Sequence, residues 1–114
     1  MIKTIEKSTI VLEKEIKAII AFTDNGLNAM VAGGNKSHVG AVSIANEKGI
    51  LNTITFPEHK ETGIAEAWAK ALFEKYNMPV VVSAGIHYDG ITSEGIKSVV
   101  EACDEMLLDF ITES

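Results

Sequence analysis

The feature that most constrains the fold of this chain is a change in the spacing of its apolar residues near residue 62. Before that point, short runs rich in isoleucine and valine alternate with turn residues, a pattern typical of β-strands. After it, Ile64, Trp68, Leu72 and Tyr76 recur every four residues and therefore share one side of a helix. The sequence thus predicts one domain, residues 1–114, whose strands come first.

The first half predicts an antiparallel meander of about five strands joined by short turns. We expect these strands at residues 10–12, 16–23, 27–32, 39–45 and 50–56. Asp24-Asn25-Gly26 predicts a type I′ hairpin turn between the second and third strands, because Asn-Gly accepts the positive φ angles of that turn. A polar, glycine-rich loop at residues 33–38 is expected to join the third strand to the fourth.

The second half predicts a helix, a strand and a final helix. Thr62 is the expected N-cap of the first helix, the apolar run at residues 79–84 is a strand in the sheet interior, and Thr92 caps the last helix. The expected fold is α/β (α+β), with a single mostly antiparallel sheet of about six strands covered by two helices. Two helices do not readily cover both faces of such a sheet, which predicts a homodimer.

The charge balance excludes some classes of partner. The chain has 16 acidic and 10 basic residues, a net charge of −6, and every basic residue is a lysine. Without arginine or a basic run, it lacks the electrostatic footprint of nucleic-acid binding. No apolar run approaches the roughly 20 residues of a membrane span, and the N-terminus has no signal-peptide core. We therefore expect a cytoplasmic protein, with Cys103 as a buried thiol in the last helix.

Three histidines lie in predicted loops at the ends of strands or before helices, where scaffolds usually display functional side chains. They are His38, His59 and His87. No acid–base–nucleophile set accompanies them, so the sequence predicts a binding protein with no catalytic residues. Together with Asp89 they satisfy the chemistry of zinc, but their spacing is not that of a zinc site, and no metal ligands are predicted.

The first histidine belongs to a glycine-rich segment that suits an anion. Its candidate binding residues are Gly33, Gly34, Lys36, Ser37, His38 and Gly40. Glycines allow backbone N–H groups to approach an anion closely, and the lysine and serine add donors. The alternative is a hairpin loop whose glycines are needed only for steric reasons.

The other two histidines each have a charged neighbour. His59-Lys60 offers a donor beside a permanent cation, which suits a phosphate, although a solvated charged patch explains it equally well. Asp89 can orient the imidazole of His87, and Tyr88 can stack on a ligand or donate to it. The alternative here is an ordinary strand-to-helix loop with a turn at Asp89-Gly90.

Taken together, segments 33–42, 56–61 and 84–92 resemble the LpdD-like family of prenylated-flavin chaperones, small proteins that accompany UbiD-type decarboxylases. The similarity runs in order from about residue 28 to residue 112. The positions that match the family's loops are Gly33, Gly34, His38, Gly40, His59, His87 and Asp89. Lys60 stands where the family commonly has arginine, which keeps the charge but loses the planar fork.

The resemblance implies that the chain binds prenylated FMN, or FMN, and delivers it to a UbiD-type decarboxylase. A flavin prenyltransferase is then a further partner. The family is also similar in fold to proteasome assembly chaperones, which implies a dimer. That likeness leaves a second interpretation open, a dimeric protein-interaction module without a small-molecule ligand.

Overall fold

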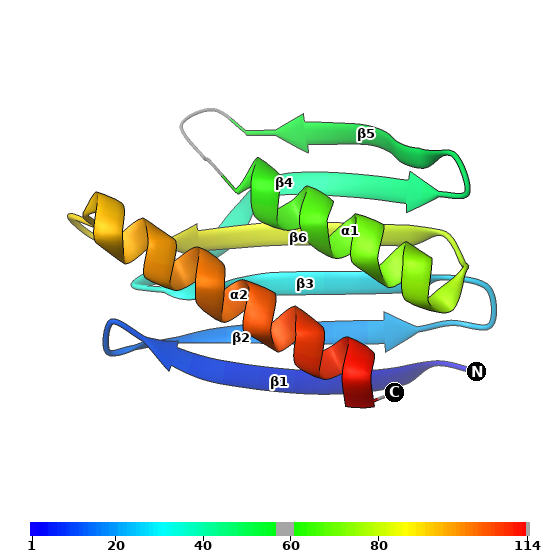
Figure 1. Cartoon of the computed structure of the whole chain (residues 1–114), viewed down its shortest axis with the longest axis horizontal. Helices are drawn as coiled ribbons and strands as arrows, with labels where there is room; N and C mark the ends of the chain where they lie inside the picture. The colour runs from blue at the N-terminus through cyan, green and yellow to red at the C-terminus, as the bar shows by residue number, and fades with distance from the viewer. Residues whose placement is uncertain (57–60, 114) are drawn as a thin grey trace.

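The computed structural model describes residues 1–56 and 61–113, which form six strands and two helices (Figure 1). The order of elements is β1 (Lys3–Val11), β2 (Lys14–Phe22), β3 (Leu27–Gly34), β4 (Lys36–Asn46), β5 (Gly49–Thr55), α1 (Thr62–Tyr76), β6 (Val80–His87) and α2 (Ser93–Glu113). The predicted α+β class, with one sheet and two helices, is confirmed. Among the described residues, neither helix is long and apolar enough to cross a membrane.

The position of β6 is the main difference from the predicted topology. The sheet has the order β1-β2-β3-β6-β4-β5, so β6 lies between β3 and β4, which a meander pairs directly. It runs parallel to β3 and antiparallel to β4, which makes the sheet mixed. The interior place of β6 was predicted correctly from its apolar run. The strands on either side of β6 were not predicted correctly. The alternation of side chains determines on which face of the sheet each residue lies, but not which strands pair with one another.

The first strand is longer than predicted. β1 begins at Lys3, whereas the apolar pattern placed the strand only at residues 10–12. Its side chains alternate between exposed and partly buried along an edge of the sheet, and many of them are polar, which hides the strand from a search for apolar runs. The turn that follows consists of Leu12 and Glu13, with φ angles of 51° and 67°. These two positive angles are typical of a two-residue hairpin turn.

The second hairpin is confirmed, but its predicted turn type is wrong. Neither Asn25 nor Gly26 has the positive φ of a type I′ turn. Instead, four residues separate the paired ends of β2 and β3. Thr23 closes this loop by donating both its backbone N–H and its hydroxyl to the carbonyl oxygen of Gly26, each at 2.9 Å. Hydrogen bonds from the threonine thus close the hairpin loop in place of the predicted type I′ turn.

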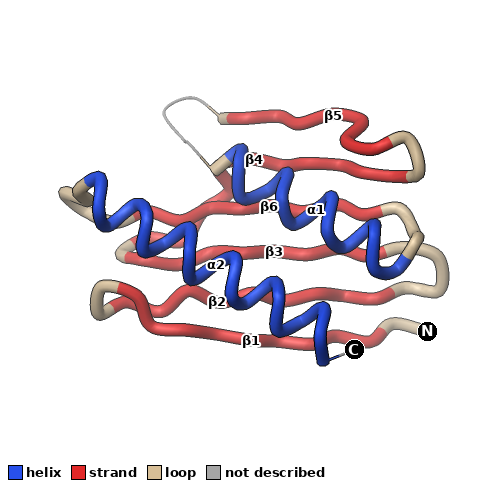
Figure 2. Tube along the Cα trace, viewed as in Figure 1, coloured by secondary structure: helices blue, strands red, loops and turns tan. Residues whose placement is uncertain are grey.

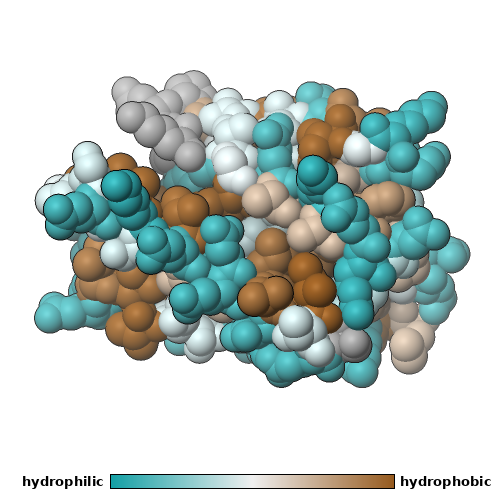
Figure 3. Space-filling view, in the orientation of Figure 1, coloured by the Kyte–Doolittle hydropathy of each residue, from teal (hydrophilic) through white to brown (hydrophobic). Residues whose placement is uncertain are grey.

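Both helices pack on the same face of the sheet (Figures 1 and 2). The largest fully buried side chains between the layers are Trp68, Ile16, Ile20, Leu27, Leu72, Val31, Val80 and Val82. Trp68 meets the ring of Phe110 from α2 edge to face, with centroids 5.8 Å apart. Hydrophilic side chains lie along the outer surfaces of the helices, with hydrophobic ones showing between them (Figure 3). The hydrophobic core therefore lies on one side of the sheet only.

The helix starts are only partly as predicted. The hydroxyl of Thr92 accepts the N–H of Gly95 at 3.0 Å, which confirms the predicted cap of α2. For α1 the prediction is wrong, since Thr62 is already helical and Glu61 is the N-cap. The Glu61 side chain makes no capping hydrogen bond. It reaches into the sheet instead, with consequences for the site described below.

The single cysteine gives a direct test of the core. Cys103 is fully buried, and this burial, with a smaller effect of the Asp104 carboxylate, raises its pKa to about 12. Because the thiolate is the reactive form, we expect its reaction with a disulfide reagent at pH 8 to be roughly a thousandfold slower in the native protein than in guanidinium chloride. Native labelling within tenfold of the denatured rate would contradict this packing.

Candidate functional site

The chain wraps around the end of β6, and this brings two of the predicted loops together. His87, at the end of β6, pairs with Gly34 of β3 on one side and with Lys36 of β4 on the other. Only Asn35 separates these two strands, and its N–H donates to the carbonyl oxygen of His87 at 2.7 Å. Segments that are far apart in sequence therefore meet at one end of the sheet.

The predicted glycine-rich loop is mostly strand. Gly33 and Gly34 end β3, and Lys36, Ser37 and His38 begin β4. Gly34 has a φ of 85°, and a Cβ there would lie 2.2 Å from the carbonyl oxygen of His87. Glycine at this position is thus required by the tight passage around β6. The sequence left open that the glycines are needed only for steric reasons, and for Gly34 this explanation is sufficient without a ligand.

His87 and Asp89 form a polar pair on the exposed side of this passage. The Nε2 of His87 lies 2.9 Å from Oδ1 of Asp89, and the backbone N–H of Asp89 donates to the side chain of Asn35 at 3.1 Å. The His87 side chain is 49% exposed, so a ligand can reach it. The carboxylate orients the imidazole, as the sequence predicted.

Tyr88, by contrast, is not available to a ligand in the way the sequence suggested. It is buried, and its hydroxyl donates to the carbonyl oxygen of Val11 at 2.7 Å. Burial, with a smaller effect of Cys103, raises the pKa of this phenol above its ordinary value. Tyr88 therefore anchors the end of β6 to the first hairpin.

A bulge in β4 places His38 next to this strand end. Ser37 pairs with Ile86 and Ala41 with Ala84, so residues 38–40 all lie opposite the single residue Gly85. A Cβ on Gly85 would lie 1.5 Å from the carbonyl oxygen of His38. The bulge therefore needs a glycine on the neighbouring strand, and bulges of this kind often re-aim a side chain at a functional site.

The bulge also holds a buried carboxylate that the sequence analysis missed. Oε1 of Glu61 lies 3.3 Å from Nε2 of His38 and accepts the backbone N–H of Ile86, also at 3.3 Å. The Glu61 side chain is only 9% exposed. A Cβ on Gly40 would lie 2.2 Å from Oε2, so this glycine leaves the space that the carboxylate fills. Within residues 1–56 and 61–113, Oε2 has no hydrogen-bond partner.

The role of Glu61 was not predicted, because in the sequence it is simply an acidic residue just before a helix. That position favours an ordinary capping role, since carboxylates are stabilised at helix N-termini. The useful signal is the pair of glycines, Gly40 and Gly85, whose missing side chains make room for the His38–Glu61 pair.

Most predicted site residues gather at this end of the sheet. Those in or beside the passage around β6 are Gly33, Gly34, Lys36, Ser37, His38, Gly40, His87 and Asp89. His59 and Lys60 lie outside the described residues. In the part of the chain that the structure describes, no three His, Cys, Asp or Glu side chains are grouped to hold a metal ion. The assembled groups suit binding, since they combine cationic, neutral and acidic hydrogen-bonding side chains in an open site.

Comparison with known proteins gives a match over most of the chain. Residues 12–114 match the model of a family described as the prenylated flavin chaperone LpdD-like domain. Protein LpdD of Lactiplantibacillus plantarum is 27% identical over 97 residues, which cover 81% of this chain and 71% of LpdD. A chain in the crystal structure of a chaperone complex for yeast 20S proteasome assembly has the same fold, with a TM-score of 0.61 over 95% of this chain and 96% of that one. Its sequence identity is 14%, so this likeness concerns the fold alone.

Replacing the glycine opposite the bulge tests the geometry of the site. We expect Gly85→Ala to lower the free energy of unfolding by about 2–3 kcal/mol, because its Cβ would collide with the backbone of His38. Gly63→Ala in α1 is the matched control, since a Cβ there meets nothing within 4 Å. It should leave stability unchanged or raise it by up to about 1 kcal/mol. Denaturant unfolding measures both, and equal effects would contradict the bulge.

Proposed function

Because the chain belongs to the prenylated flavin chaperone LpdD-like family, we propose that it binds prenylated FMN at the end of β6 and delivers it to a UbiD-type decarboxylase. The family is one of chaperone domains and not of catalytic enzymes. The proposal concerns the ligand, its site and its recipient. It includes a homodimer as the working form and a flavin prenyltransferase as the source of the cofactor.

The observation that carries this proposal is the meeting of three segments around one strand end. Lys36 and His87 are partners across the β4–β6 pair, so both side chains project from the same face of the sheet. His87 is held by Asp89. The Lys36 ammonium offers donors for a phosphate group in a chain that has no arginine, and the His87 imidazole adds a donor at Nδ1 when both of its nitrogens are protonated. We therefore expect the flavin phosphate to bind beside this pair.

Glu61 makes one end of the site electrostatically different from the other. Its carboxylate is buried and the phosphate is also anionic, so the phosphate is disfavoured next to the His38–Glu61 pair, whereas water screens the exposed carboxylate of Asp89. An uncharged part of the flavin, such as the imide edge of its ring or the ribityl chain, suits that end of the site because it brings no second negative charge near the buried carboxylate. The ligand is thus expected to lie with its phosphate toward Lys36 and an uncharged part toward Glu61.

The openness of the site suits a carrier, which must release its cargo. His87 and Asp89 have side chains that are 49% and 77% exposed. An enzyme active site usually excludes water and encloses its reacting groups. A half-open site that offers hydrogen bonds fits transfer of an intact cofactor to a second protein.

Cofactor loading provides the first test. The wild-type protein and a His38→Ala, His87→Ala double variant are co-expressed with a flavin prenyltransferase, purified, and compared by absorbance and mass spectrometry. We expect the wild type to carry the prenylated flavin and the double variant to carry at least about tenfold less, since hydrogen bonds from charged groups contribute roughly 1.5–3 kcal/mol. If both proteins carry equally little flavin, the proposed function is wrong.

The phosphate contact is tested separately with FMN and riboflavin. We expect Lys36→Ala to weaken FMN binding by about tenfold and to leave riboflavin binding unchanged, because only FMN carries the phosphate. Lys48→Ala is the matched control, because Lys48 lies in the β4–β5 turn at the opposite end of β4. Fluorescence titration measures both ligands. A loss of riboflavin affinity equal to that of FMN would contradict a phosphate at Lys36.

The second candidate function is a protein-interaction module that needs no small-molecule ligand. The uncovered face of the sheet favours it, because apolar side chains project there from several strands. This candidate predicts that the His38→Ala, His87→Ala variant still binds a UbiD-type decarboxylase as tightly as the wild type, with or without flavin. Binding to the decarboxylase that depends on flavin loading would exclude it.

A further inference from the structure

Asn35, the single residue between β3 and β4, forms two hydrogen bonds with the segment that follows β6. Its backbone N–H donates to the carbonyl oxygen of His87 at 2.7 Å, and its side-chain Oδ1 accepts the backbone N–H of Asp89 at 3.1 Å. The two bonds lie on either side of Tyr88, so one residue holds both ends of segment 87–89. Asn35 was not among the binding residues that the sequence predicted.

The second of these bonds determines where Asp89 lies. The Asp89 side chain is 77% exposed, and its Oδ1 lies 2.9 Å from Nε2 of His87. Gly90 follows with a φ of 60°, and a Cβ there would meet nothing within 4 Å, so packing at this position does not hold the turn. A side chain that is mostly in water samples several rotamers unless hydrogen bonds select one. The Asn35 oxygen therefore fixes the backbone from which Asp89 reaches the imidazole.

A chain of contacts thus connects Asn35 with both groups assigned to the phosphate. Lys36 is the next residue, and it pairs with His87 across β4 and β6. In the other direction, Asn35 holds Asp89, and Asp89 holds the His87 ring. Loss of the Asn35 side chain is therefore expected to release the imidazole from its position relative to the Lys36 ammonium.

The chemistry of an amide suits this position. An aspartate would accept the same N–H, but it would add a negative charge directly beside Lys36, where the phosphate is proposed to bind. Asparagine accepts the bond and remains neutral. Asn35 thus combines a fixed geometry with the absence of charge.

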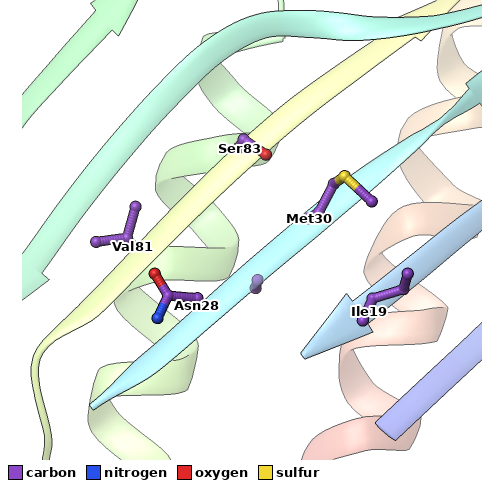
Figure 4. A pocket seen from close by; sticks show the side chains of 6 residues that line it. Ile19, Asn28, Met30, Val81 and Ser83 are labelled. Atoms are coloured by element: carbon purple, nitrogen blue, oxygen red, sulfur yellow. The ribbon is translucent and has the colours of Figure 1, made fainter. Parts of the chain in front are cut away.

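The hollow on the uncovered face of the sheet is not an equivalent site for an anion. Its lining consists of Ile19, Asn28, Ala29, Met30, Val81 and Ser83 (Figure 4). None of these residues is charged, so a phosphate in the hollow finds no cation there. The strand end, with Lys36 beside Asn35, is therefore the better place for the anionic end of a ligand.

We propose that Asn35 is a positioning residue of the phosphate site. Through Asp89 it holds the His87 imidazole where the ring and the Lys36 ammonium reach the same anionic group, and it adds no charge of its own. This inference rests on the proposed function, because the anionic group is taken to be the phosphate of the flavin. Since Asn35 acts on the ligand through His87, its loss should matter only as long as His87 is present.

A double-mutant cycle in FMN binding tests this dependence at pH 6, where an ordinary imidazole is mostly protonated. We expect Asn35→Ala to weaken binding about fivefold and His87→Ala about tenfold, as measured by fluorescence titration. The double variant should bind no more weakly than His87→Ala alone, because both substitutions remove the same contact. Asn46→Ala is the matched control, since the Asn46 side chain also accepts a backbone N–H, that of Lys48, at the opposite end of β4. It should leave FMN binding unchanged.

Amide hydrogen exchange and a conservative variant separate positioning from a general loss of structure. Asn35→Ala should speed the exchange of the Asp89 amide about tenfold, whereas Asn35→Asp retains the acceptor and should keep this amide protected. Asn35→Asp should nevertheless bind FMN more weakly than the wild type and riboflavin equally well, because riboflavin lacks the phosphate.

The inference is overturned if Asn35→Ala binds FMN as tightly as the wild type, or if its effect multiplies with that of His87→Ala. An equal loss of affinity in Asn46→Ala overturns it as well. Should Asn35→Ala not fold, an Asn35→Asp protein with unchanged FMN affinity does the same. A wild type that binds no flavin removes the proposed function, and the cycle is then measured with inorganic phosphate, where equal affinities of the wild type and Asn35→Ala overturn this inference too.

Discussion

The structure depends on one constraint, the placement of β6 between β3 and β4. Because β6 fills this position, the chain has to pass from β3 to β4 around its end, with Asn35 as the only connecting residue. The hydrogen bond from the Asn35 N–H to His87 fixes the passage. Gly34 and Lys36 are thereby aligned on either side of His87. A single topological choice thus assembles the candidate site without a long loop.

The bulge in β4 shows how the sheet accommodates an acidic group at a buried position. Removing a carboxylate from water is unfavourable unless hydrogen bonds or opposite charges compensate for it. Glu61 receives the Ile86 N–H and lies beside His38, while Gly40 and Gly85 supply the space. Each of these features weakens regular strand pairing. Their combination at one strand end, where several residues together depart from regular strand pairing, is typical of a functional site.

The sequence predicted the types of the elements better than their arrangement. Alternation and helical spacing were sufficient for the strands, both helices and the interior place of β6, and the loop motifs identified most of the residues at its end. Strand neighbours were not predictable, because the glycine-rich sequence at residues 33–38 looks the same whether β3 and β4 pair directly or enclose another strand. Glu61 was missed because its burial arises only when the bulge, a distant glycine and the start of α1 come together.

The central position of β6 also sets the order in which the molecule can fold. β3 and β4 make few direct contacts and are held together mainly through β6, which follows β4 only after β5 and α1. Closing such long-range pairs is entropically slow compared with forming hairpins. During synthesis, β3 and β4 lack their common partner strand until residues 80–87 have left the ribosome. The candidate site at the end of β6 is therefore completed in a late step, and a truncated product that lacks β6 has neither His87 nor the strand ends that pair with it.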